Sequence, residues 1–199
     1  MISTIKETTP LLKPNFVKPL LIHYRHNTID RTWEAVKSHD SVSILLYNLD
    51  LDSFVFVKQF RAPVLLNNQT DGMMYELCAG LVDKKLSLAQ IAQEEIFEEC
   101  GYEVALENIQ EITSFYTSVG ISGAKQTLFY APLSEDLKRN EGGGLEDEDI
   151  EVIFIKRQEV KQFILDAKFQ KTPGLIMSVY WFFDTIEKNL RSSDANKID

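Results

Sequence analysis

The chain has 199 residues and carries 30 acidic against 21 basic side chains, a formal net charge of −9. Its hydrophobic content of 44% is ordinary for a globular protein, and a chain of this length can bury one full core. Nucleic acids and anionic membranes attract basic surfaces, so we expect neither as a partner. The N-terminus lacks the pattern of a signal peptide and no apolar run is long enough to span a membrane, so we expect a cytoplasmic protein.

Cysteine and histidine usage argues against several kinds of chemistry. The two cysteines, Cys78 and Cys100, follow no metal-binding spacing and suggest no disulfide framework, so we expect inert thiols in the core. The three histidines all lie before residue 40, without a serine and acid pattern for a catalytic triad. Nucleophilic catalysis by a side chain is therefore not expected.

The N-terminal part of the chain is expected to form an arm followed by a hairpin. A polar lead precedes a short strand over residues 20–24 and a segment over residues 31–36 that contains Trp33. Two runs rich in β-forming residues follow, over residues 41–48 and 54–60, and the turn residues between them predict a hairpin.

The middle of the chain predicts a loop, a strand and a helix. Residues 65–72 are largely polar and predict a loop, and residues 73–79 predict a third strand. The helix is expected over residues 87–100, with Ser87 as its N-cap and Gly101 supplying the left-handed residue that ends it.

The remaining elements complete an α/β protein in layers, because strands surround one central helix and two further helices close the chain. A polar, glycine-containing loop is expected over residues 134–148, and a disordered tail over residues 191–199. The later strands are expected at residues 109–116, 126–133 and 149–156, and the later helices at residues 159–169 and 173–190.

Four carboxylates lie within the segment EEIFEECG, residues 94–101. At about 100° per residue, Glu95 and Glu99 fall inside the apolar stripe of the expected helix. Like charges one turn apart on a buried face are destabilising unless something neutralises them. Mg²⁺ and Mn²⁺ prefer such hard oxygen ligands and often share their coordination with substrate phosphates. A solvated acidic helix face is the alternative, but the position of Glu95 and Glu99 favours a metal site.

The segment from Gly80 to Tyr102 resembles the Nudix box, the signature of hydrolases that act on nucleoside diphosphates linked to another moiety. Two positions depart from the box: Leu86 stands in place of a glutamate, and Glu94 in place of an arginine that usually buttresses the catalytic carboxylates. The resemblance implies the Nudix fold, with mixed β-sheets sandwiched between helices, over residues 41–190. The matching positions are Gly80, Glu95, Ile96, Glu98, Glu99, Gly101 and Tyr102.

Further motifs resemble a narrower group, the UDP-sugar pyrophosphatases related to ADP-ribose pyrophosphatases. ADP-ribose enzymes tend to carry a proline where Ser118 stands, so we favour hydrolysis of UDP-glucose to UMP and glucose 1-phosphate. Hydrolysis of ADP-ribose is one alternative, and a Nudix protein that binds a nucleotide without cleaving it is another, motivated by Leu86 and Glu94. The motifs are LLIHYRHN, HDSVSILLYN, VKQFR, ELCAGLVD, SVGISGAKQTLFY and GGGLEDEDIEV.

The resemblance also implies which residues bind metal. Glu95, Glu99 and the Ala79 carbonyl would bind Mg²⁺, with Mn²⁺ as an alternative. Glu98 would complete or support that site and counts among the expected catalytic carboxylates. Bound cations would screen the diphosphate, orient it and lower the pKa of an attacking water.

A second acidic cluster, over residues 146–152, resembles a mobile loop that supplies a catalytic base in related enzymes. We expect Glu146 or Glu148 to be that base; an ordinary solvated acidic loop is the alternative. Three glycines at residues 142–144 would let the loop close over substrate, or would serve as a plain connector.

The resemblance implies four substrate-binding residues. Arg61 matches a position that reaches the diphosphate or the sugar, with an ordinary surface arginine as the alternative. Glu76 matches a position that contacts either substrate or the fold. Tyr24 and Arg25 would reach a nucleobase across a homodimer, because related enzymes exchange N-terminal arms such as residues 1–40.

Overall fold

The computed structural model describes residues 3–13, 17–68, 70–145 and 148–188. The expected tail over residues 191–199 and Glu146 lie outside this described part. The strands are β1 (Lys18–His26), β2 (Ile29–Lys37), β3 (Ser41–Asn48), β4 (Ser53–Phe60), β5 (Met73–Glu76), β6 (Cys78–Leu81), β7 (Gln110–Thr117), β8 (Ala124–Leu133) and β9 (Ile150–Lys156). The helices are α1 (Ala62–Asn68), α2 (Leu88–Cys100), α3 (Val160–Leu165) and α4 (Pro173–Phe182), with shorter helical turns at Leu106–Asn108, Glu135–Leu137 and Phe183–Glu187.

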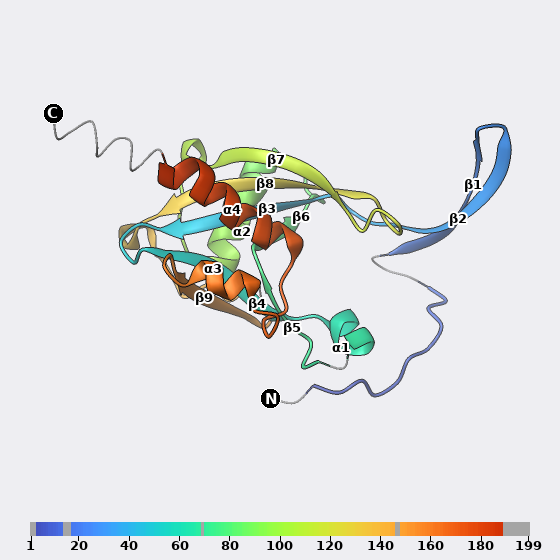
Figure 1. The fold of residues 1–199 in the computed structure, drawn as a ribbon, viewed down its shortest axis with the longest axis horizontal. Coiled ribbons are helices and arrows are strands. Elements are labelled where there is room, and N and C mark those ends of the chain that lie inside the picture. Colours follow the sequence, from blue (N-terminus) through green and yellow to red (C-terminus); the bar gives the residue numbers. More distant parts are fainter. Residues whose placement is uncertain (1–2, 14–16, 69, 146–147, 189–199) are drawn as a thin grey trace.

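A seven-stranded mixed sheet forms the centre of the body (Figure 1). The strands run in the order β5, β4, β3, β8, β7, while β6 adds to β3 and β9 adds to β4. The pair β3 and β8 is parallel, and the other pairs are antiparallel. Residue Ser43 of β3 lies opposite Ala79 of β6, so this register places the two residues next to each other in the sheet.

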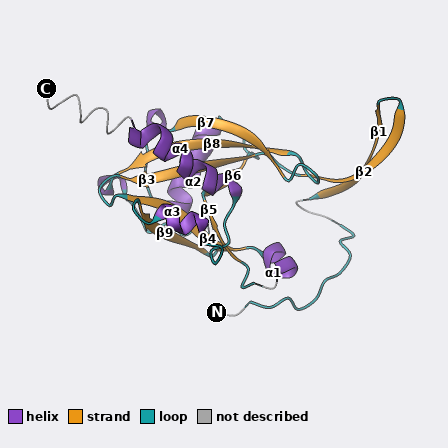
Figure 2. Ribbon diagram, in the orientation of Figure 1, coloured by secondary structure: helices purple, strands orange, loops and turns teal. Residues whose placement is uncertain are grey.

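Each face of the sheet is covered by helices, so the expected α/β/α layering is confirmed (Figure 2). Along β3 the side chains alternate between the two layers: Ile44 packs in the core beneath α2, and Leu45 in the core beneath α3 and α4. Burial on both faces explains why the middle of each strand, residues 44–47 of β3 and 54–57 of β4, is a continuous apolar run. The second core is aromatic, with the rings of Phe54 and Phe182 centred 4.8 Å apart.

The hairpin of β1 and β2 projects away from the body (Figure 1). Its two turn residues, Asn27 and Thr28, both have positive φ, which is the backbone twist that two-residue hairpin turns favour. Two hydrogen bonds connect the hairpin to the loop after β7. The indole N–H of Trp33 donates to the Gly120 carbonyl at 2.9 Å, and the Val36 amide donates to the Ile121 carbonyl at 2.9 Å.

Two expectations for the segment before α2 were wrong. The expected polar loop over residues 65–72 begins instead as the C-terminal half of α1, because Pro63 suits a first helical turn, where its missing N–H is not needed. The expected strand over residues 73–79 is broken at Leu77, since β5 pairs with β4 whereas β6 pairs with β3. The chain therefore changes neighbours just before Ala79.

The helix expected over residues 159–169 is shorter than expected, whereas the one expected over residues 173–190 is helical as far as residue 188, where the described part ends. Helix α3 ends at Leu165 because Asp166 adopts an extended conformation and its carboxylate accepts a hydrogen bond from the Lys168 amide, a local turn that competes with the helix. Helix α4 is regular only to Phe182 and continues as a π-helical turn. None of the described helices has the length and apolar character that crossing a bilayer requires.

Candidate active site

Helix α2 is the scaffold of the candidate site. Ser87 and Gln90 form a reciprocal capping box at its start, and Gly101, with φ of 79°, ends it by donating to the Phe97 carbonyl at 3.0 Å. Ile91 and Ile96 anchor the helix in the core. The expected start, end and apolar face of this helix are confirmed, so its carboxylates project from a rigid element.

Glu99 is the most buried carboxylate of the helix, with 4% of the residue exposed. Its Oε2 accepts a hydrogen bond from the Ala79 amide at 3.0 Å, which fixes the helix against β6. Burial raises the pKa of Glu99 to about 8; the hydrogen bonds from the Ala79 amide and the Cys78 thiol oppose this rise, whereas the charges of Glu95 and Glu148 add to it. Without a cation, the Glu99 side chain therefore favours its protonated form at neutral pH.

Glu95 lies beside Gly80, and this contact explains why a residue without a side chain stands at position 80. A Cβ on Gly80 would lie 1.9 Å from Glu95 Oε1, so any larger residue would displace the carboxylate. Burial raises the pKa of Glu95 to about 7, and the charge of Glu98 adds to the rise, while Lys84 opposes it. The two carboxylates expected to bind metal thus both have elevated pKa values.

Lys84 is a member of the cluster that the sequence analysis missed. Its ammonium lies 2.7 Å from Glu94 Oε2, and this hydrogen-bonded pair raises the pKa of Lys84, with further contributions from Glu98 and Glu95. Glu94, which stands where the Nudix box has an arginine, therefore does not leave the cluster without a cation. The sequence did contain a signal for it: Glu94 adds a negative charge to an already acidic helix, so a basic side chain nearby is expected to pair with it.

The three glycines at residues 142–144 dock against the end of α2. The Gly143 amide donates to the Glu99 carbonyl at 2.9 Å and the Gly144 amide to the Glu98 carbonyl at 3.1 Å. Gly142 approaches the Glu99 carbonyl so closely that a Cβ would lie 2.2 Å from it. We call residues 139–145 the glycine strap, which satisfies backbone carbonyls at the helix end.

The glycine strap leads into Glu148. The carboxylate of Glu148 accepts a hydrogen bond from the Leu145 amide at 3.0 Å, and its charge contributes to the raised pKa values of Glu95 and Glu99. The structure therefore brings Glu148 to the α2 carboxylates. Glu146, the other candidate base, lies outside the described residues.

Arg61 and Glu76 form a bidentate pair next to the same cluster. Arg61 Nε and Nη2 donate to the two Glu76 oxygens at 2.8 and 2.9 Å. This pairing raises the pKa of Arg61, and the charges of Glu99 and Glu148 contribute. Arg61 is the guanidinium that the structure presents to the acidic cluster.

Tyr24 and Arg25 lie on the projecting hairpin, away from α2 in the same chain (Figure 1). Arg25 forms an exposed bidentate pair with Asp30 across the hairpin, at 2.6 and 2.7 Å. The structure therefore does not bring these two residues to the carboxylates within one chain, and their role in substrate binding stays a prediction.

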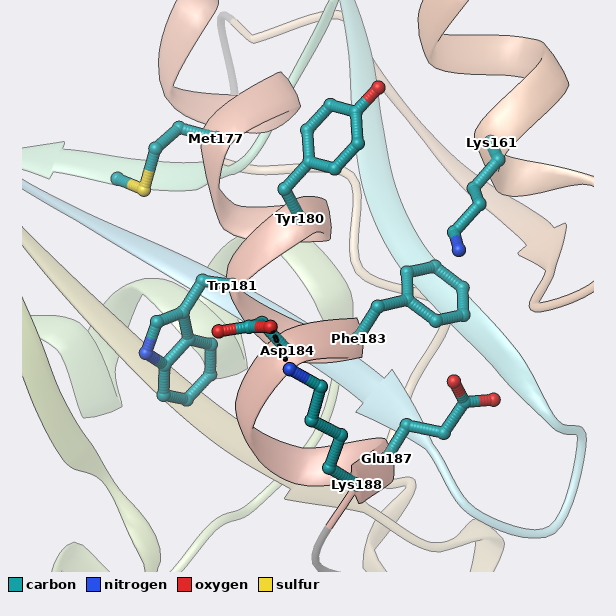
Figure 3. Close-up of a pocket in the computed structure, with 8 residues that line it drawn as sticks. All are labelled: Lys161, Met177, Tyr180, Trp181, Phe183, Asp184, Glu187 and Lys188. Atoms are coloured by element: carbon teal, nitrogen blue, oxygen red, sulfur yellow. Dashed lines mark hydrogen bonds and ion pairs between the residues drawn. The ribbon is translucent and has the colours of Figure 1, made fainter.

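A cavity of about 410 Å³ adjoins the cluster on the α4 side of the sheet. It reaches Glu76 and Ala79 at one end and is bounded by Ser43 of β3, Phe115 of β7 and the start of α4 at Gly174. A larger hollow of about 680 Å³ lies along the outer face of α4 (Figure 3). That hollow is lined by groups such as Phe183 and Lys161. The smaller cavity is instead lined by Glu76, which pairs with Arg61, and by Ala79, whose amide bonds Glu99, so it is the better candidate for substrate.

The carboxylates suit a divalent cation, although the described residues contain no ready-made group of three metal ligands. Mg²⁺ keeps several waters and shares its coordination with substrate phosphates, so it does not need an all-protein cage. The elevated pKa values of Glu95 and Glu99 record burial and mutual repulsion, which a cation would relieve. The donor set therefore fits the expected metal.

Comparison with known proteins decides the family. A family model described as the NUDIX domain matches residues 37–189, which is most of the chain. The chain belongs to the Nudix family. The structure places the Nudix helix at α2, with the box glycine at Gly80 and the box carboxylates at Glu95, Glu98 and Glu99.

Two kinds of relatives are similar over much of the chain. The uridine diphosphate glucose pyrophosphatases of Bos taurus and Mus musculus are 36% and 33% identical to it, and each alignment covers 88% of this chain and 91% of the relative. The GDP-mannose pyrophosphatase of Pectobacterium atrosepticum is 36% identical over 69% of each chain.

Proposed function

We propose that this Nudix protein hydrolyses the diphosphate of a nucleotide sugar, with UDP-glucose as the preferred substrate and UMP and glucose 1-phosphate as products. The observation that carries the proposal is the convergence of Glu95, Glu99, Glu148 and Arg61 beside a cavity whose wall, Glu76 apart, is formed by residues without acidic or basic charge. The similarity to UDP-glucose pyrophosphatases over nearly the full chain supports the choice of sugar nucleotide.

Hydrolysis requires water to form a bond to one phosphorus while the bridging oxygen leaves with the other phosphate. Glu95, Glu98 and Glu99, with the Ala79 carbonyl, would hold Mg²⁺ or Mn²⁺, which supplies charge screening and a more acidic bound water. Arg61 remains partly exposed beside Glu76 and offers its guanidinium to the diphosphate oxygens.

Glu148 is the described candidate for the base that takes the proton of the attacking water. Its carboxylate is set by the Leu145 amide and lies close enough to influence the titration of Glu95 and Glu99. Glu146 remains the second candidate for this role.

A homodimer is part of the proposal. The hairpin of β1 and β2 exposes large apolar side chains, including 54% of Leu21 and 55% of Ile29, and an isolated two-stranded hairpin is marginal in water. A second copy of the chain covering this arm would bury that surface and could carry Tyr24 and Arg25 toward the partner's substrate. The cytoplasmic location stays a prediction.

The test is a panel of UDP-glucose, UDP-galactose, GDP-mannose and ADP-ribose, each incubated with Mg²⁺ and analysed for products by chromatography. We expect UMP and glucose 1-phosphate at the highest kcat/KM, and no products with an excess of chelator. Preference for ADP-ribose would replace the proposed substrate. Binding without cleavage of any member would support the alternative of a non-catalytic nucleotide-binding protein.

A further inference from the structure

Ser43 is a buried hydroxyl that the fold leaves without a partner. Only 2% of the residue is exposed, and among the described residues its Oγ makes no hydrogen bond. Folding a hydroxyl into such a position is unfavourable unless some other group completes its hydrogen bonding. Ser43 lines the 410 Å³ cavity, so that group can come from a ligand.

The other polar groups around Ser43 are neutral and mixed in character. Gln126 donates through Nε2 to Ser41 Oγ at 3.1 Å, and its Oε1 lies toward the start of α4, 3.5 Å from where a Cβ of Gly174 would stand. The side chain of Thr172 caps none of the first amides of α4, and such amides point toward the N-terminal end of a helix. The cavity thus offers both donors and acceptors.

The lining excludes a charged occupant. Among the described lining residues, Glu76 is the one carboxylate and there is no Lys, Arg or His; both Glu76 oxygens accept from Arg61. Phe115 supplies an apolar wall, with its Cζ 3.3 Å from the position of a Cβ on Gly174. A sugar ring matches these features, because its hydroxyls both donate and accept and its C–H face packs on aromatic rings.

The position of the cavity selects the hexose over the nucleobase. Its wall includes Ala79, whose amide is bonded to Glu99, so the cavity begins where the diphosphate must lie. In a nucleotide sugar the hexose is bonded directly to a phosphate, whereas a ribose separates the base from the diphosphate. Resting on the proposed function, we infer that this cavity is the hexose subsite and that Ser43 and Gln126 determine which hexose is accepted.

The experiment is a factorial comparison of UDP-glucose, UDP-mannose, GDP-glucose and GDP-mannose with parent and Ser43→Ala protein. We expect Ser43→Ala to lower kcat/KM for the preferred hexose about tenfold, since one hydrogen bond to a substrate hydroxyl is lost. The ratio of kcat/KM for the glucose substrate to kcat/KM for the mannose substrate should change by the same factor in the uracil and guanine series. The ratio of uracil to guanine substrates at a fixed hexose should stay as in the parent.

Two further variants keep the result interpretable. Gly174→Ala adds one methyl group against Phe115 and Gln126 in a backbone conformation that alanine accepts, and it should also change the hexose ratio. Ser53→Ala is the matched control, because Ser53 is buried in β4 and its hydroxyl donates to the Leu51 carbonyl at 2.8 Å. Unfolding temperature is measured for each, and Ser43→Ala should match or exceed the parent.

A change in the uracil to guanine ratio at constant hexose ratio would overturn the inference and assign the cavity to the base. Unchanged ratios throughout would overturn it as well. If the parent hydrolyses none of the four, the proposed function fails instead. Calorimetric titration then tests the cavity separately: binding of glucose 1-phosphate must weaken in Ser43→Ala while binding of UMP does not, and equal binding would overturn the subsite.

Discussion

Glu99 is a carboxylate that folding almost removes from water, and its hydrogen bond with the Ala79 amide only partly offsets that burial. Its folded-state pKa of about 8 lies above the ordinary value of 4.5. The folded protein therefore holds this proton more tightly than the unfolded chain does. The resulting stabilisation is fully present below about pH 4.5 and is lost as the pH rises through about 8.

The pH dependence of stability tests this burial in metal-free protein. With chelator present, we expect the unfolding temperature of Glu99→Gln to exceed that of the parent at pH 9 and to match it at pH 5, because glutamine keeps an acceptor for Ala79 and carries no charge. Thermal melts followed by circular dichroism across this range measure the difference. Glu107→Gln, an exposed position, is the control and should parallel the parent. A constant difference between Glu99→Gln and the parent would contradict the buried charge.

Lys84 offsets the repulsion within the cluster when no metal is bound. We expect Lys84→Met to lower the unfolding temperature of the metal-free protein by about a degree or two, since the pair with Glu94 is partly exposed. With Mg²⁺ the loss should shrink, because the cation then offsets the same charges. Differential scanning fluorimetry with and without Mg²⁺ gives both values, and Lys85→Met serves as control. An equal loss in both conditions would show that Lys84 acts independently of the metal site.

The glycine strap is the element that connects the acidic loop to the Nudix helix. It is held by two backbone hydrogen bonds to α2 and by the close approach of Gly142 to the Glu99 carbonyl. Its glycines have positive φ values of 70°, 109° and 80°, which other residues adopt at a cost. We therefore regard the strap as a fixed support for Glu148 in this state.

Substitution of Gly142 tests that support. Gly142→Ala would place a Cβ 2.2 Å from a backbone oxygen, so the strap must shift. We expect a loss of roughly 1–3 kcal/mol in the free energy of unfolding and a lower kcat, because Glu148 moves with the strap. Gly120→Ala is the control, since its Cβ would meet open space. Parent-like kcat in Gly142→Ala would contradict a supporting role of the strap in catalysis.

Local pattern sufficed for the Nudix helix and failed where distant segments meet. The buried position of Glu99 on α2 and the end at Gly101 follow from residues a few positions apart, and the structure confirms both, while Glu95 is half-buried beside Gly80. The break at Leu77 depends on which strands lie beside β5 and β6, which no local pattern reveals.

The cavity likewise could not be predicted from local sequence patterns, because its wall is formed by segments that are distant in the chain. Ser43 reaches it because β3 pairs with β6 on one side and runs parallel to β8 on the other, which also brings Gln126 close. In the sequence Ser43 is one polar residue within an apolar strand, and its missing partner becomes visible only when the surrounding elements are placed. Lys84 was missed for a related reason, since its partner lies across a loop.

At the scale of the whole molecule, the projecting hairpin is the reason we expect a homodimer. Its exposed apolar side chains favour a second copy of the chain as the covering surface. We expect Leu21→Lys combined with Ile29→Lys to shift the protein from dimer to monomer in analytical ultracentrifugation at micromolar concentration. Leu165→Lys, at an exposed position of the body, is the control and should stay dimeric. A monomeric parent would remove the dimer from the proposal.

Turnover of UDP-glucose by the parent and by Glu99→Gln, in Mg²⁺ and at matched folded fractions, is the decisive measurement. Glu99→Gln keeps the shape of the side chain and its acceptor for the Ala79 amide but loses the charge that a cation needs. We expect kcat to fall by about a hundredfold or more while the unfolding temperature is kept or raised, with Glu107→Gln as active as the parent. Parent-like turnover of Glu99→Gln would contradict a metal-dependent site on this helix.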